Sequence, residues 1–183
     1  MLRYLFCFCF TGIILSETQV IVDPEGTDDE TCLEDKNIHC KSLTYVFSQI
    51  TENIDVTLTN GTFEETSGIN ISSALSISIT GEGSTSIISG YAATERSTFV
   101  LTNTHSLTLT NLAIFRTVNT FIVGNNLQTA VFSSLYLIDN AEDFSTSPLF
   151  QFTSCDGISF TFSEHLIVSF FLYTNLFISC LSS

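Results

Sequence analysis

The sequence predicts an all-β fold of the parallel β-helix (solenoid) type, with one short helix capping its N-terminal end. Three observations support this prediction. Segments in which Ser or Thr alternates with apolar residues recur after residue 50. The apolar set is dominated by 17 phenylalanines and by β-branched residues, which fit a pleated sheet better than a helix. A short amphipathic helical pattern precedes the recurring segments.

Five alternating segments are predicted to form equivalent strands. Successive side chains of a strand point to opposite faces, so the apolar residues face inward and the Ser and Thr residues face outward. If one apolar residue of each segment is taken as equivalent, the steps are 21, 30, 23 and 28 residues, which lies in the range of solenoid repeats. These equivalent residues are Val56, Ile77, Leu107, Ala130 and Ile158.

Shorter apolar segments lie between the five and predict two or three strands in each coil. Stacking of one coil on the next would bury the apolar edges that a single coil leaves open. A β-sandwich is the alternative, because it also contains short alternating strands. Tight-hairpin dipeptides are few, with Asn60-Gly61 the clear case, and this favours the solenoid. The shorter segments are 87–88, 99–101, 113–115, 121–123, 135–138 and 149–152.

The capping helix is predicted directly after Ser42. A serine hydroxyl at this position can accept a hydrogen bond from a free backbone N–H of the first turn. Leu43, Val46, Phe47 and Ile50 follow at helical spacing and form one apolar stripe. We expect this stripe to cover the first coil and to shield strand edges that would otherwise recruit other chains.

The N-terminal segment resembles the opening of the pectin-lyase-like right-handed β-helix proteins. The resemblance lies in residues 21–29, then Cys32, then residues 40–46. In that family a first strand leads to a Gly- and Asp-rich loop, a cysteine pair and a short capping helix. The alternating segment at 107–114 is similar to the family's coils. The resemblance implies a right-handed parallel β-helix, secreted or surface-exposed, here in a non-catalytic form.

The two ends of the chain suggest targeting segments. Residues 1–16 are expected to be a signal peptide, because Arg3 precedes an apolar stretch that ends at the small residue Ser16. The chain is therefore expected to use the secretory pathway and to be extracellular or at the cell surface. The apolar segment 166–183 has three interpretations, which are a last coil, a membrane segment and a lipid-anchor signal. A truncated sequence is a further interpretation.

Between these ends we expect two parts. Residues 17–52 hold the first strand, a cysteine-linked loop and the capping helix, and residues 53–165 hold the coils. Four cysteines lie outside the expected signal peptide, an even number that suggests disulfides in a secreted protein. Three pairings are open, and Cys32 with Cys40 is preferred because it closes a short loop beside the helix. The remaining disulfide candidates are Cys155 and Cys180.

Charge and motifs exclude some classes of function. The net charge is −14 with five Lys and Arg residues, so no basic stripe exists for nucleic acid. Membrane contact is expected only if the C-terminal segment anchors the chain. We assign no catalytic residue, metal ligand or cofactor. The only Asp pair, Asp28-Asp29, precedes the coils, and its acidic surroundings lack the spacing of a calcium loop. His39 beside Cys40 lacks the spacing of a zinc site.

Two glycosylation sequons begin at Asn60 and Asn70, and each is expected on a turn. Alternatively, Asn60, Asn111 and the pair Asn125-Asn126 could stack as one ladder of turn residues. The leading hypothesis is a secreted or cell-surface module for adhesion, or for binding glycans or surface proteins, without catalysis. The alternatives are a polysaccharide lyase or hydrolase of pectin-lyase-like fold and a truncated, non-functional fragment of a larger surface protein.

Overall fold

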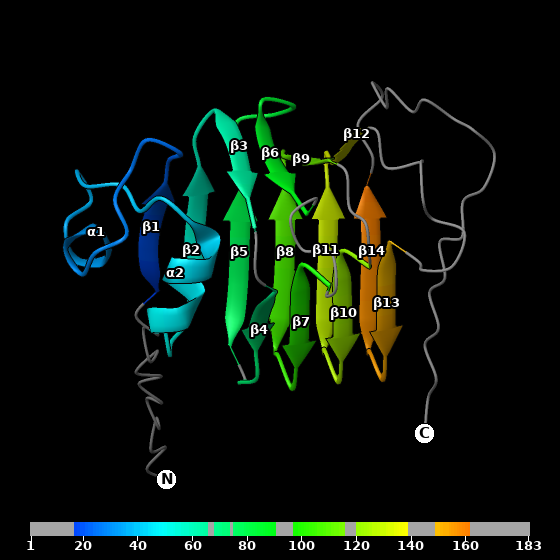
Figure 1. Ribbon diagram of the computed structural model, residues 1–183. Coiled ribbons are helices and arrows are strands. Elements are labelled where there is room, and N and C mark those ends of the chain that lie inside the picture. Colours follow the sequence, from blue (N-terminus) through cyan, green and yellow to red (C-terminus); the bar gives the residue numbers. More distant parts are fainter. Residues whose placement is uncertain are drawn as a thin grey trace, which may run out of the picture.

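A parallel β-helix is the architecture of this chain. A computed structural model describes residues 17–65, 68–73, 75–90, 97–115, 120–138 and 149–161. Every pairing between the strands of this part of the chain is parallel, and the strands form three sheets. The chain enters the sheets in a fixed cycle and winds in the right-handed sense from left to right in Figure 1. The predicted solenoid is confirmed, and the sandwich alternative is excluded.

Sheet A is the longest sheet and has six strands in the order β1-β2-β5-β8-β11-β14. It contains the five alternating segments that the sequence predicts as strands, and β1 precedes them. Its strands run side by side across the whole solenoid in Figure 1. Their bounds are Thr18–Val22 (β1), Ile54–Leu58 (β2), Ser76–Thr80 (β5), Ser106–Thr110 (β8), Thr129–Ser133 (β11) and Gly157–Thr161 (β14).

Sheets B and C complete each coil with four strands apiece. The predicted shorter apolar segments between the five all contribute a strand to one of them. The strands of sheet C lie in front of sheet A in Figure 1 and run in the opposite direction. Sheet B holds β3 (Gly61–Glu64), β6 (Ser86–Ser89), β9 (Ala113–Phe115) and β12 (Tyr136–Ile138), and sheet C holds β4 (Ile69–Ile71), β7 (Phe99–Thr102), β10 (Ile122–Asn125) and β13 (Phe150–Thr153).

The predicted column of equivalent residues is correct at four of its five positions. Ile77, Leu107, Ala130 and Ile158 occupy matching positions in neighbouring strands of sheet A. The first member is wrong, because Ile54 pairs with Ile77 while Val56 pairs with Ile79. Both are fully buried, so a shift of two residues leaves the inward face unchanged. Alternation alone therefore cannot distinguish the two registers.

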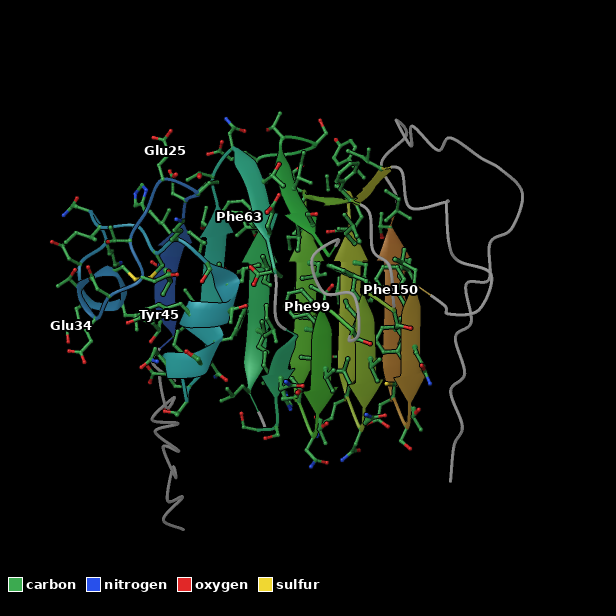
Figure 2. The ribbon with its side chains drawn as sticks, viewed as in Figure 1. Glu25, Glu34, Tyr45, Phe63, Phe99 and Phe150 are labelled. Carbon is green, nitrogen blue, oxygen red and sulfur yellow. A yellow bond between two sulfur atoms is a disulfide. The ribbon has the colours of Figure 1, made fainter. Side chains whose placement is uncertain are left out.

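Phenylalanines fill the interior between the sheets. Phe132 and Phe160 occupy neighbouring rungs of sheet A and stack with ring centroids 4.7 Å apart. Phe99 and Phe121 meet edge to face at 5.4 Å. Figure 2 shows Phe99 and Phe150 in the space enclosed by the sheets. These contacts continue from coil to coil, so each coil is stabilised mainly by its neighbours.

The N-terminal end carries the predicted capping helix, α2 (Leu43–Gln49). The Ser42 hydroxyl accepts a hydrogen bond from the Tyr45 backbone N–H at 3.1 Å, which confirms its N-cap role. Leu43 and Val46 are fully buried, and the Phe47 ring meets Phe99 edge to face at 6.3 Å. The predicted stripe therefore faces the first coils.

A disulfide-linked loop covers part of the outer edge of β1. The Cys40 backbone N–H donates to the Ile21 carbonyl at 2.9 Å, and the Asp23 N–H donates to the Cys40 carbonyl at 2.8 Å. The loop also contains α1 (Thr31–Glu34), a single helical turn that the sequence analysis did not predict. Covering this edge removes hydrogen-bonding groups that could pair with another chain.

Both predicted targeting segments lie outside the described residues. The signal peptide at 1–16 and the apolar segment at 166–183 therefore stay predictions. Within the described part of the chain, no helix has the length and apolar character that crossing a membrane requires.

Candidate functional site

The outer face of sheet A presents three columns of side chains that run across the strands. Eleven of their sixteen members are Ser or Thr, and the members in β2 to β14 are half-buried or exposed. We call these columns the hydroxyl face. Two columns begin in β1. The first is Ile21, Thr57, Thr80, Thr110, Ser133 and Thr161, and the second is Gln19, Asp55, Ser78, Thr108, Val131 and Ser159. The third begins in β5 and is Ser76, Ser106, Thr129 and Gly157.

One column carries a hydroxyl on every rung from β2 to β14. Its members lie about 4.8 Å apart, because that is the spacing of neighbouring strands. Thr110 Oγ1 and Ser133 Oγ are 3.0 Å apart and share a hydrogen bond. Along a strand the outward residues lie about 6.6 Å apart, since two residues of a parallel strand span that distance. The result is a regular two-dimensional array of hydroxyl groups.

The hydroxyl face is almost free of charge. Asp55 is the only ionisable residue in its three columns, although the whole chain carries −14. Between β2 and β14, Val131 is the one large apolar side chain that interrupts the columns, and it is 40% exposed. The acidic residues gather instead in the N-terminal loop, where Figure 2 shows Glu25 and Glu34 pointing away from the solenoid. The three columns themselves are thus nearly free of charge, although Glu52, Glu82 and Asp156 lie in the turns that flank strands of sheet A.

The N-terminal acidic loop also borders a shallow depression. Asp23, Thr27, Asn37 and His39 are among the residues that line it. Asp23 Oδ2 lies 3.4 Å from His39 Nδ1. The backbone N–H of Glu25 donates to the Asp23 carboxylate at 2.9 Å and lowers its pKa, with smaller contributions from Thr59 and His39. The hydrogen bond between Asp23 and the Glu25 N–H joins residues two apart and stabilises the turn at the start of the loop.

Two carboxylates of the N-terminal loop, residues 23–41, hold the loop and the capping helix in place. Asp28 Oδ1 accepts from the backbone N–H groups of Lys41 and Ser42 at 2.8 and 3.0 Å. Asp29 accepts from the Thr31 backbone N–H at 2.9 Å and from its hydroxyl, and the hydroxyl bond lowers the pKa of Asp29. The residues that the structure describes include no group of three or more His, Cys, Asp or Glu side chains placed to hold a metal ion.

A buried carboxylate that the sequence analysis missed lies beneath the helix. Glu65 follows β3, is 1% exposed, and accepts from the backbone N–H groups of Leu43 and Thr44 at 3.1 and 3.2 Å, and from the Thr44 hydroxyl. Burial raises its pKa, and the hydrogen bonds from Thr44 and Leu43 partly offset the rise. A signal existed in the alternation, because Phe63 faces inward, Glu64 outward, and Glu65 inward again.

Carboxylates that could act as a catalytic pair are not brought together on the described strands. Asp55 is the single carboxylate among the outward residues of sheet A, and Glu64 is the single one in sheet B. The outward residues of sheet C that pair across its four strands are Asn70, Val100, Val123 and Gln151. Acid–base cleavage of a glycosidic bond by a carboxylate pair needs two such groups flanking one bond.

The preferred disulfide is confirmed. Cys32 and Cys40 are bonded, with their Cα atoms 5.0 Å apart, and both are buried. Cys155 lies half-buried in the turn between β13 and β14, and its Sγ is 3.9 Å from the Thr153 carbonyl oxygen. Its candidate partner, Cys180, lies outside the described residues, so that pairing stays a prediction.

The two sequons differ in their structural setting. Asn60 is exposed at the corner between β2 and β3, as predicted, and its Oδ1 accepts from the Thr85 hydroxyl. Gly61 follows with φ +145°, and a side chain there would collide with Pro24. Asn70 is exposed but lies within β4, so its predicted turn position is wrong.

The alternative in which the asparagines stack as one ladder of turn residues is also wrong. Asn126 Nδ2 donates to Asn103 Oδ1 at 2.8 Å, and both residues follow strands of sheet C with φ near +55°. Asn111 follows a strand of sheet A instead, and its Nδ2 donates to the Gly81 carbonyl at 3.0 Å. The asparagines therefore stabilise separate corners, each by its own contact between neighbouring coils.

Comparison of the chain with protein-family models, with curated proteins and with solved structures finds no match.

Proposed function

We propose that this chain is a secreted or cell-surface β-helix module that mediates adhesion by binding glycans or surface proteins without cleaving them. The observation that carries the proposal is the hydroxyl face, with its nearly uncharged columns of Ser and Thr on successive rungs. Each hydroxyl offers one donor and two acceptor positions, which suits it to polar, uncharged groups on a partner.

Four further observations support the secreted setting. The Cys32–Cys40 disulfide suits an oxidising compartment. Residues 1–16 have the pattern of a signal peptide, and Asn60 and Asn70 are exposed within sequons. The N-terminal resemblance to pectin-lyase-like proteins agrees with the same setting. We propose that this chain is a non-catalytic relative of those proteins.

The experiment measures binding and cleavage side by side. Labelled full-length protein is applied to immobilised polysaccharides, both neutral and acidic, and to whole cells, while reducing ends and unsaturated products are assayed in parallel. The proposal predicts retention on at least one surface with no release of product. Cleavage of a pectin-like polymer would overturn the non-catalytic assignment and favour the lyase or hydrolase alternative.

A matched pair of variants locates the surface. Thr108→Arg places a bulky charge in the middle of the hydroxyl face, and Gln151→Arg places the same side chain on the exposed outer side of sheet C. We expect Thr108→Arg to abolish retention and Gln151→Arg to preserve it, with both variants retaining the wild-type circular dichroism spectrum. Equal loss in both variants would show that the hydroxyl face is not the binding surface.

A further inference from the structure

We infer that the ligand of the hydroxyl face is an extended, uncharged polysaccharide whose chain runs across the strands along the columns. This inference rests on the proposed binding function and names its ligand class and orientation. It follows from the low charge of the face, the regular spacing of its hydroxyls, their order before binding and the small free energy of each hydrogen bond.

Charge disfavours ionic polymers. The chain carries −14 overall, so an acidic polysaccharide approaching any face is repelled by the whole molecule. A basic polymer would be drawn to the N-terminal acidic loop rather than to the hydroxyl face, where Asp55 is the only ionisable residue of the columns. A neutral polymer meets neither effect. Its hydroxyl groups both donate and accept hydrogen bonds, as the Ser and Thr side chains do.

The repeat of the face fixes the orientation. The column from Thr57 to Thr161 offers a hydroxyl on each of five successive strands, which spans about 19 Å at the usual strand spacing. Along a strand of sheet A the outward positions number at most three, as in Ser76, Ser78 and Thr80, which is about 13 Å. An extended polymer therefore gains most repeated contacts when it lies across the strands.

Two adjacent hydroxyls of the continuous column are also held in place before a ligand arrives. Thr110 and Ser133 are hydrogen-bonded to each other at 3.0 Å, and both are half-buried by their neighbours in the sheet. Threonine has restricted side-chain freedom because it is β-branched. Little side-chain entropy is then lost on binding, and the spacing of the array is set by the backbone of the sheet.

The energetics predict a strong dependence on polymer length. A surface hydrogen bond contributes only about 0.5–1.5 kcal/mol, because it replaces bonds to water. The columns contain no aromatic side chain on which a sugar ring could stack. A short oligosaccharide should bind weakly, and a long polymer should bind well because its repeated contacts act together.

The test compares the full chain on neutral β-glucan, neutral mannan and acidic polygalacturonate, each as long polymer and as short oligomer. We expect binding to at least one neutral polymer, weaker binding to its oligomer, and no loss of affinity as salt is raised, because no charge is screened. Binding to polygalacturonate alone would overturn the neutral-ligand inference and leave the proposed binding function standing. Retention on whole cells with no polysaccharide bound would also overturn the inference alone. Absence of binding to every polymer and to cells would overturn both.

Removal and addition of single hydroxyls test the columns. Thr80→Val with Thr110→Val deletes two hydroxyls of the continuous column and keeps β-branched residues, and we expect about tenfold weaker binding. The matched control, Thr102→Val with Thr153→Val, makes the same change in sheet C and should leave affinity unchanged.

Val131→Thr fills the gap in the middle column and should strengthen binding a few-fold. Unchanged affinity in the sheet A double variant and in Val131→Thr would overturn the inference.

Discussion

Glu65 lies buried beneath the capping helix and accepts a hydrogen bond at 3.1 Å from the backbone N–H of Leu43, the first residue of α2. The two residues are 22 positions apart in the sequence. The contact joins the helix to the corner that follows β3, so the cap is attached to the first coil through a carboxylate. Free N–H groups at a helix N-terminus favour a negative partner.

We expect Glu65 to make stability depend on pH. Burial raises its pKa, so the folded protein holds the proton more tightly than the unfolded chain does. Its contribution to stability is therefore fully present below the unfolded pKa of about 4.3 and is lost as pH rises through the folded pKa. Denaturant titrations across this pH range should show the free energy of unfolding of Glu65→Gln rising relative to that of the wild type as pH increases. Glu64→Gln, at the exposed neighbouring position, serves as the control. If the difference in unfolding free energy between Glu65→Gln and the wild type did not change with pH, the raised pKa of Glu65 would be contradicted.

The Cys32–Cys40 disulfide should stabilise the N-terminal loop. Replacing both cysteines by serine is expected to lower the free energy of unfolding by about 2–3 kcal/mol, because the unfolded chain is no longer constrained. Chemical denaturation measures the difference. A reducing agent should lower the stability of the wild type by more than it lowers the stability of the double variant, in which Cys155 and Cys180 remain. If the reductant changed both proteins equally, the stabilisation would have another origin.

The stacked rings in sheet A should dominate the stability of the later coils. Phe132 is buried and stacks on Phe160, so Phe132→Ala should cost about 3–5 kcal/mol in unfolding free energy. The adjacent residue Val131 faces outward and is exposed, so Val131→Ala should change stability by less than about 0.5 kcal/mol. Thermal unfolding compares the two variants. Equal losses would contradict the assignment of inward and outward faces.

The corner asparagine Asn126 should tolerate glycine better than alanine. Its φ is +55°, and its side chain donates to Asn103. Both substitutions remove this hydrogen bond, but alanine also adds left-handed backbone strain of about 1–2 kcal/mol. Asn126→Ala should therefore unfold at lower denaturant than Asn126→Gly. The reverse order would show that the backbone of this corner differs from the one described.

Much of the fold could be predicted from the sequence because the solenoid signal is local. Ile77, Leu107 and Ala130 lie in segments whose alternation separates an inward from an outward face, and each stacks on the next as expected. The register of the first coil could not be predicted, since a shift from Val56 to Ile54 preserves the alternation. The observed step from Ile54 to Ile77 is 23 residues and the predicted step from Val56 is 21, and the alternation carries no mark that separates the two.

Less of the candidate site than of the fold could be predicted from the sequence. The Ser and Thr positions were visible as polar residues between apolar ones, but their alignment into columns depends on the register of sheet A. Glu65 was missed because its partners, Leu43 and Thr44, are distant in sequence. The asparagines were grouped wrongly because Asn111 and Asn126 look alike in sequence while they follow strands of different sheets.

The most direct test of the central claim is a backbone amide NMR titration of the labelled protein with a soluble neutral oligosaccharide. The account predicts that chemical-shift changes concentrate in β5, β8 and β11, around Thr80 and Thr110, and that sheet C and the loop at 23–41 stay unchanged. Changes concentrated in that loop, around Asp23 and His39, or on the outer side of sheet C would contradict the claim that the hydroxyl columns form the binding face.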